Sequence, residues 1–324
     1  MLKIFVITFP FFALVLAGYL AARRRMLPIE AITGLNGFVL FFALPCMLYR
    51  FGANTPIAQL LDIPAAVTWL VCGLIMVGFT IAISLNSRIG WNDAAFGALV
   101  AAFPNSGFMG VPLLVALLGA PAAGPTILTM VIDMIVITSL CIALSRLDGA
   151  DKHGAGKALK NALKGVLANP LPWSILLGAL VSVLGFQLPQ PVNQVVGMLA
   201  DAASPVALFT IGAVLARSQM LAIAGHVPAP RLGDYLPAAL LKLFLHPLLV
   251  LLVGASVIRL GVPLDRFALK VIVLVAALPS ASNVSLLAER FGADNGRVAR
   301  IILVSTAAAF FTFSMAVGWL AGSA

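Results

Sequence analysis

The chain has 324 residues, of which 62% are hydrophobic and only 10% are charged, and its mean hydropathy is +1.10. A soluble domain carries about 25% charged residues, and a soluble chain this apolar could not cover its surface with polar groups. The composition excludes a soluble globular protein and predicts an all-α membrane protein.

The net charge of +9 comes from basic residues in short loops between apolar runs. In a soluble protein this excess would suggest a nucleic-acid partner, but here membrane topology explains it, and no nucleic acid is expected. The three cysteines lie inside apolar spans and are expected to be small buried side chains: Cys46, Cys72 and Cys141.

The first apolar run, residues 2–22, is predicted to be a retained span. Its main basic cluster follows the run, whereas a cleaved signal peptide has its basic region first. Later apolar runs predict nine more helices, so that the chain would cross the lipid bilayer ten times. These runs are 34–54, 64–86, 91–118, 123–146, 169–186, 194–217, 235–259, 266–291 and 297–321.

The basic residues are unequally divided between the two sides of the predicted membrane. Five lie at the N-terminus or in even-numbered loops: Lys3, Arg50, Arg259, Arg266 and Lys270. Fourteen lie in odd-numbered loops: Arg23, Arg24, Arg25, Arg88, Arg146, Lys152, Lys157, Lys160, Lys164, Arg217, Arg231, Arg290, Arg297 and Arg300. The positive-inside rule places the odd-numbered loops in the cytoplasm and both termini outside it.

The two halves of the chain resemble each other. Residues 99–104 read LVAAFP and residues 274–279 read LVAALP, and other prolines pair in order: Pro10 with Pro172, Pro28 with Pro189, Pro45 with Pro205. Five spans per half is an odd number, so the second copy starts on the opposite side of the membrane. This predicts two inverted five-helix repeats, residues 1–146 and 169–324, joined by a cytoplasmic linker at 147–168.

The fourth and ninth spans are predicted to be broken and to cross near the membrane midplane, because proline removes a backbone hydrogen bond and glycine weakens a helix. Half-helix N-termini and neutral polar groups at such a crossing would attract an anion. The alternative is a pair of kinked helices whose polar residues cap their own backbone. The candidate substrate-binding residues are Pro104, Asn105, Ser106, Gly107, Pro279, Ser280, Ser282 and Asn283.

Four ionisable residues inside the spans are candidates for proton or ion coupling. Asp133 would relay protons or bind a cation, or else would be a structural partner. Asp201 would contribute to a cation site or face an outer vestibule. Lys242 and His246 share one helix face; snorkelling of Lys242 to the cytoplasmic surface is the favoured interpretation, and a Lys242–Asp133 pair is the alternative.

The sequence contains no Gly-Lys-Ser/Thr phosphate loop and no Gly-x-Ser-x-Gly nucleophile motif, and its three histidines form no zinc pattern. No enzyme activity, cofactor or metal is therefore expected.

The motifs at the two predicted breaks resemble those of the auxin efflux carrier family. Residues 104–114, PNSGFMGVPLL, resemble its fourth-span Asn-x-Gly-Phe-x-Gly-x-Pro signature, and residues 277–292, ALPSASNVSLLAERFG, resemble its ninth-span signature. The resemblance implies a transport domain that moves against a scaffold, both drawn from the two repeats, and a substrate bound at the crossing. It assigns the family's conserved positions to Asn105, Pro279 and Asn283, and the short central loop is similar to that of bacterial members.

We therefore expect a secondary carrier of a small organic anion, such as a mono- or dicarboxylate, that works by alternating access in a bacterial inner membrane. The alternatives are a sodium-coupled symporter or cation–proton antiporter of related fold, and a membrane-embedded sensor or partner-binding protein. Coupling to H⁺ or Na⁺ and assembly into a homodimer are left open by the sequence.

Overall fold

The computed structural model describes residues 2–54, 62–147, 170–223 and 231–322. Within these ranges the regular structure is entirely helical, with no strand. Six helical stretches are long and apolar enough to cross a membrane: Ile29–Asn54, Ile63–Ser84, Ala120–Leu144, Gln190–Arg217, Leu232–Arg259 and Asn295–Leu320. The all-α membrane class is confirmed, whereas the ten-span inverted repeat stays a prediction, and nearly all of the linker expected at 147–168 lies outside the described residues.

The chain divides into two compact units, and each takes segments from both halves of the sequence. The first comprises Met1–Asp62, Gly107–Leu128 and Asn169–Ala224. The second comprises Ile63–Ser106, Thr129–Ala168 and Gly225–Ala324. The helix α8 (Ala123–Ile132) passes from one unit to the other.

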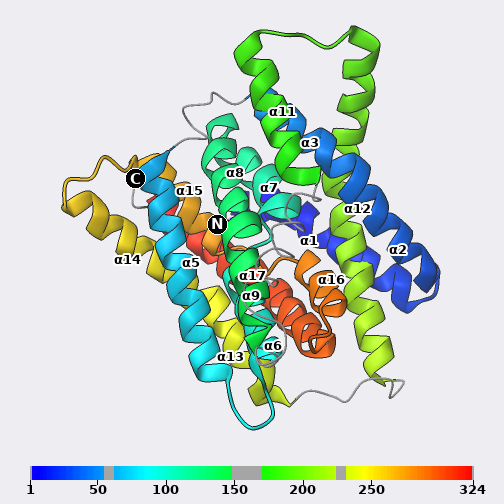
Figure 1. The fold of residues 1–324 in the computed structure, drawn as a ribbon. Helices are drawn as coiled ribbons and strands as arrows, with labels where there is room; N and C mark the ends of the chain where they lie inside the picture. The colour runs from blue at the N-terminus through cyan, green and yellow to red at the C-terminus, as the bar shows by residue number, and fades with distance from the viewer. Residues whose placement is uncertain (1, 55–61, 148–169, 224–230, 323–324) are drawn as a thin grey trace. The chain divides into compact units, whose positions relative to one another are not determined.

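The first unit is built around the 34-residue helix α12 (Gln190–Ile223), which at 1.5 Å per residue is about 51 Å long. The helix α1 crosses α12 and packs against it (Figure 1). Pro205 lies inside α12 without ending it. The other helices of this unit are α1 (Leu2–Arg23), α2 (Ile29–Phe38), the π-helical η1 (Val39–Ala43), α3 (Leu44–Asn54), α7 (Val111–Leu118), the short η3 (Ala120–Ala122) and α11 (Pro170–Leu184).

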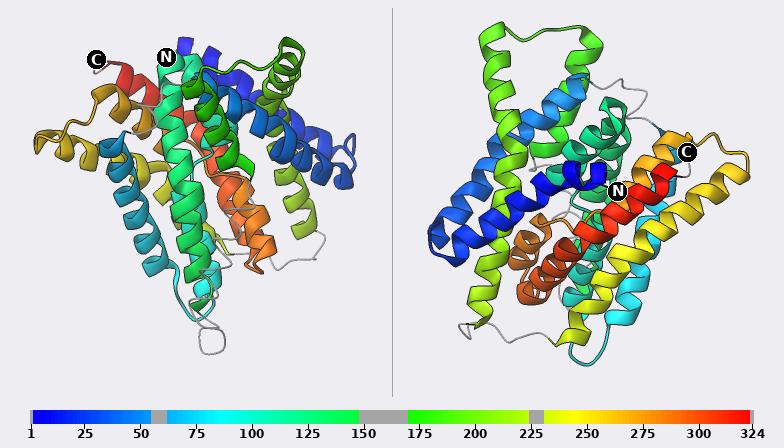
Figure 2. Two further views of the ribbon diagram at one scale, coloured as in Figure 1. Left: turned by 45° about the horizontal axis from the view of Figure 1, so that its top comes forward. Right: turned by 180° about the vertical axis from the view of Figure 1, so that it is seen from behind.

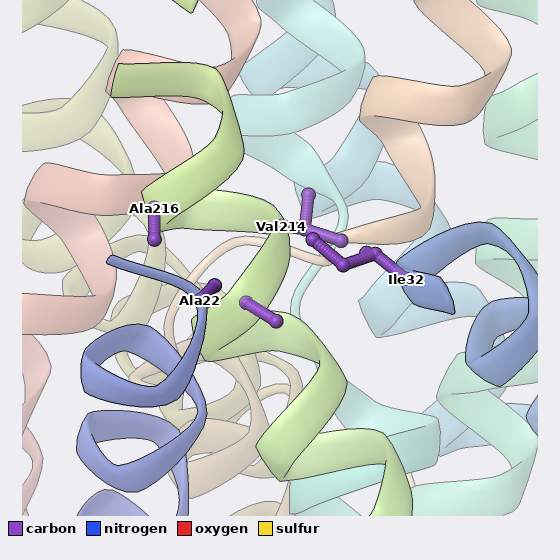
Figure 3. Packing of buried hydrophobic residues seen from close by; sticks show 5 residues of the cluster. Ala22, Ile32, Val214 and Ala216 are labelled. Carbon is purple, nitrogen blue, oxygen red and sulfur yellow. The ribbon is translucent and has the colours of Figure 1, made fainter. Parts of the chain in front are cut away.

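Glycines let α1 and α12 meet backbone to backbone. A Cβ atom at Gly18 would lie 1.8 Å from the carbonyl oxygen of Phe209, and one at Gly212 would lie 1.8 Å from that of Val15. Small residues at helix interfaces are the usual means of close packing in membranes, where the hydrophobic effect does not drive helices together. Beside this contact, an apolar cluster of Ala22, Ile32, Ala213, Val214 and Ala216 joins α1, α2 and α12 (Figure 3).

Replacing Gly212 with alanine is expected to destabilise the first unit by about 1–3 kcal/mol, the usual cost of overpacking. The neighbouring atom is backbone, so α1 and α12 must move apart to admit the methyl group. The measurement is unfolding of the purified protein in a titration with sodium dodecyl sulfate. Gly197→Ala is the control, since it lies on the same helix with nothing within 4 Å of its added Cβ. Equal stability of the two variants would contradict the close contact.

The second unit contains the remaining helices, and its spans differ in continuity. In the span Leu232–Arg259, α13 (Leu232–Leu240), the π-helical η6 (Leu241–Leu245) and α14 (His246–Arg259) follow one another without interruption. The helix α17 (Asn295–Gly322), drawn in red in Figure 2, is also continuous. The others are α5 (Ile63–Ser84), α6 (Trp91–Ala102), the π-helical η4 (Asp133–Ile137), α9 (Thr138–Leu144), α15 (Arg266–Ala276) and α16 (Asn283–Arg290).

A buried arginine, Arg297, connects several helix ends in the second unit. The guanidinium of Arg297 donates hydrogen bonds to the carbonyl oxygens of Asp234 and Asp93, at 2.6 and 2.7 Å, and to the hydroxyl of Ser84 at 3.2 Å. Gly97 leaves room for it, because a Cβ there would lie 2.5 Å from Nη1. One side chain thus ties together the ends of α5, α6, α13 and α17.

Candidate functional site

Two helices of the second unit are interrupted where the sequence predicts. The helix α6 ends at Ala102, and helical structure resumes with the π-helical η2 (Ser106–Gly110). The helix α15 ends at Ala276, and α16 begins at Asn283 (Figure 1). Pro104 and Pro279 lie inside these gaps and prevent continuous helical hydrogen bonding.

The two gaps bond to each other through the main chain. The N–H of Asn105 donates to the carbonyl oxygen of Pro279 at 2.8 Å, and the N–H of Ala281 donates to that of Phe103 at 2.9 Å. Pro104 and Ser280 therefore form an isolated antiparallel bridge. We call residues 103–106 and 279–281 the crossover. Because unpaired backbone groups are costly inside a membrane, this exchange is what lets both helices break.

Several polar side chains gather at the crossover. Asn105 is 4% exposed, and its amide forms no hydrogen bond with another described residue. The buried hydroxyl of Ser280 has no hydrogen-bond partner among the described atoms, whereas the Ser280 N–H donates to the Ser305 hydroxyl at 3.2 Å. The hydroxyl of Ser106 makes a long contact of 3.5 Å with the Pro104 carbonyl. The crossover thus holds an amide and a hydroxyl that form no hydrogen bond with the residues described by the structure.

The remaining predicted crossover residues are placed differently. Ser282 and Asn283 are half-buried at the start of α16, where the Ser282 carbonyl accepts bonds from the N–H and hydroxyl of Ser285. Gly107 belongs to the first unit, so it is not part of the site described within the second.

A second group of polar residues lies buried among the helices of the same unit. The indole N–H of Trp69 donates to Oδ1 of Asp133 at 2.8 Å, and the rings of Trp69 and His246 lie 5.1 Å apart. The Lys242 ammonium lies 3.0 Å from Nδ1 of His246, and its charge acts on the Asp133 carboxylate. We call these four residues the charge cluster. Asp133 Oδ2 and His246 Nε2 have no hydrogen-bond partner within the described structure.

Lys242 joins the charge cluster to the end of α15, the helix that precedes the crossover. Its ammonium donates to the carbonyl oxygen of Ala276, the last residue of α15, at 2.9 Å. A cation at this point satisfies an orphan carbonyl and complements the negative end of the helix dipole. Snorkelling of Lys242 to the surface is therefore wrong: the side chain is 0% exposed and points to the broken end of α15.

Both charged residues of the cluster sit in π-helical segments. Asp133 begins η4, and Lys242 is the second residue of η6. The hydroxyl of Thr138 donates to the Asp133 carbonyl, five residues earlier, at 2.8 Å. Such segments inside α-helices are frequent at functional sites, since they turn one side chain away from the regular helical register.

Asp201 does not join the charge cluster. It lies in the first unit, where its carboxylate accepts a bond from the Arg50 guanidinium at 2.7 Å, and 71% of its side chain is exposed. Arg50 and Asp201 thus form a surface ion pair. Among the described residues, no group of three or more His, Cys, Asp or Glu side chains is arranged to hold a metal ion.

Sequence reasoning missed Trp69, which is fully buried in α5. Its indole N–H could have indicated the contact, because a buried tryptophan usually needs a hydrogen-bond acceptor and the apolar spans contain few acceptor side chains. Asp133 was one of those few acceptors.

Residues 3–317 match the profile of a protein family described as "Membrane transport protein". The chain belongs to this family, the auxin efflux carriers. Because the match covers almost the whole chain, the protein is a multi-pass membrane transporter, and membership of the auxin efflux carrier family does not imply an enzyme.

Individual relatives of this auxin efflux carrier family member come from bacteria and plants. A Rhizobium meliloti protein named "Putative malonate transporter" is 30% identical over 298 residues, covering 92% of this chain and 89% of the relative. The Escherichia coli protein named "Uncharacterized transporter YfdV" is 26% identical over 289 residues, covering 87% and 86%. "Auxin efflux carrier component 8" of Arabidopsis thaliana is 23% identical over 327 residues, covering 84% and 85%.

Proposed function

We propose that the protein is a secondary carrier that binds a small carboxylate at the crossover and moves it by alternating access. The observation that carries the proposal is the pair of backbone hydrogen bonds between residues 103–106 and 279–281, which holds two broken helices together. Around this bridge lie the uncommitted amide of Asn105 and the hydroxyl of Ser280. Neutral donors of this kind can bind a carboxylate without a buried cation in direct contact with it.

Helix ends favour an anion over a neutral solute. The helix α16 begins at Asn283, next to the crossover, so its N-terminus contributes positive potential there. The negative potential at the end of α15 is offset by the Lys242 ammonium. The N-terminus of α16 and the Lys242 amine thus both favour an anion near the crossover, in agreement with the dicarboxylate in the name of the Rhizobium meliloti relative.

The charge cluster supports coupling to protons over coupling to sodium. Lys242 occupies this buried space and takes up the Ala276 carbonyl, so Asp133 Oδ2 is the one oxygen of the charge cluster without a partner among the described residues, whereas a bound metal cation needs several oxygen ligands. Asp133 and His246 can instead take up or release a proton, and each has one uncommitted atom. Two further titratable side chains are buried in this unit, Cys72 on α5 and Cys141 on α9.

The crossover and the charge cluster lie in one unit, so we propose that the second unit is the transport domain and that the first is the scaffold. Protonation of the charge cluster would change the hydrogen bond from Lys242 to the Ala276 carbonyl. Through that bond it would change the end of α15, next to the crossover. The proposed orientation has both termini outside the cytoplasm of a bacterial inner membrane, as the distribution of basic residues favours.

The test is uptake of labelled malonate, and of a panel of mono- and dicarboxylates, into liposomes that contain the purified protein. We expect accumulation of at least one carboxylate above that of protein-free liposomes. An imposed proton gradient should drive it, acid outside for a symporter and acid inside for an exchanger, whereas a sodium gradient should not. Failure of every carboxylate under every gradient would refute the carrier; sodium-driven uptake would refute the proton coupling alone.

A further inference from the structure

A groove with a volume of about 580 Å³ lies in the second unit, away from the crossover. It is bounded by the end of α14, the start of α15 and the end of α17, and three basic residues line it: Arg259, Arg266 and Lys270. No acidic side chain in the described parts of the chain pairs with any of the three. Asp265 precedes Arg266, but its carboxylate accepts the Ala268 N–H at 2.9 Å and caps α15.

Membrane topology does not explain why these cations are here. The span Leu232–Arg259 has Arg259 at one end, while Arg88 and Arg297 bind Asp234 at the other. The groove therefore lies at the end of the unit opposite to the one where loop cations concentrate. Three of the five basic residues that the sequence assigns to this side are gathered in one groove. A charge distribution set only by the positive-inside rule would leave this end poor in cations.

The walls of the groove are apolar. Leu251, Ala255 and Ile258 follow one another at helical spacing along α14, and they face Phe267 and Val273 of α15. From Leu251 to Arg259 the helix rises by about 12 Å, so the apolar wall of the groove extends about that far from the cationic rim. Large apolar side chains beside it are exposed, among them Leu252 on α14 and Trp319 on α17.

From this arrangement we propose that the groove binds an anionic phospholipid. Its phosphate would be held by the three basic side chains, and an acyl chain would lie along the apolar wall of α14 and α15. Arginine and lysine are the usual partners of a phosphate, and basic pockets between membrane helices are suited to anionic headgroups. A small dicarboxylate would use the cations but would leave the apolar wall unfilled. The lipid bound here would hold α14, which begins at His246, against α15, which ends at the crossover.

The test is native mass spectrometry of the full-length protein in neutral detergent, with phosphatidylglycerol or phosphatidylcholine added at equal concentration. We expect wild-type protein to retain phosphatidylglycerol at least tenfold better than phosphatidylcholine. Arg266→Gln/Lys270→Gln should lose most of this preference. The control Arg24→Gln/Arg25→Gln removes the same charge from exposed positions of the first unit and should keep it. Equal retention of the two lipids by wild type, or an unchanged preference in Arg266→Gln/Lys270→Gln, would overturn the proposal.

A third variant keeps the charges and fills the groove. Ala255→Trp places a large ring on the apolar wall, so phosphatidylglycerol retention should fall although all three cations remain. Retention at the wild-type level would mean that the acyl chain does not lie there and would overturn the proposal. Malonate is the competitor that separates a lipid site from a substrate route: displacement of phosphatidylglycerol by millimolar malonate would also overturn it, whereas unaffected retention supports it.

Discussion

Replacing Asn105 with alanine is expected to weaken carboxylate binding by about 10- to 100-fold. A hydrogen bond to a charged group contributes about 1.5–3 kcal/mol, and each 1.4 kcal/mol is a factor of about ten in affinity. The substitution removes only the side-chain amide; the main-chain bond from Asn105 to Pro279 at 2.8 Å is available to alanine as well. The measurement is isothermal titration calorimetry with malonate, or with whichever carboxylate the liposomes accumulate.

The protein should remain folded in this variant, because the Asn105 amide forms no hydrogen bond with another described residue. Thermal unfolding in detergent checks that point. Asn193→Ala is the matched control, since it deletes the same group from an exposed position on α12. Wild-type affinity in Asn105→Ala would remove this residue from the substrate site.

Replacing Lys242 with methionine is expected to lower the free energy of unfolding by about 1–3 kcal/mol, the range for leaving a buried hydrogen-bonding group without its partner. The side chain is fully buried and bonded to the Ala276 carbonyl, so its loss leaves that carbonyl uncapped and leaves Asp133 without its nearby cation. Proton-driven uptake should be lost together with stability. Lys270→Met, at a half-buried position in the same unit, should change the free energy of unfolding far less.

A double variant separates the loss of folding from the loss of coupling. In Asp133→Asn/Lys242→Met both charges are gone, so the part of the loss that comes from an unbalanced charge on Asp133 should be recovered, while the Ala276 carbonyl still lacks its donor. Uptake in liposomes should nevertheless no longer respond to an imposed proton gradient. If the double variant still accumulates substrate in proportion to that gradient, the charge cluster is not the coupling site.

The crossover could be predicted from the sequence because its signals are local. Pro104 and Pro279 break helices wherever they occur, and the matching hexapeptides indicated which two breaks belong together. The reciprocal bonds between Asn105, Pro279, Phe103 and Ala281 then follow from the need to satisfy backbone groups in lipid. The prolines and the low polarity of the membrane therefore both favour two broken helices that bond to each other.

The charge cluster could be predicted only in part, because it depends on packing between distant segments. In the sequence Lys242 lies close to the end of its predicted span, which favours a position near the surface. The structure instead places it in η6, beside a helix end that is 34 residues away in sequence. The pairing of Arg50 with Asp201, 151 residues apart, was missed for the same reason. The sequence identifies Arg50 only as a loop cation and Asp201 only as a cation ligand or vestibule residue.

The bridge between Pro104 and Ser280 consists of main-chain atoms alone. Side chains that project from it can therefore be exchanged without unfastening the two helices, as long as the prolines keep the breaks in place. If the crossover is the substrate site that we propose, selection can change what it recognises while the supporting framework persists. A family of proteins built in this way could change substrate through a few substitutions while the fold stays the same.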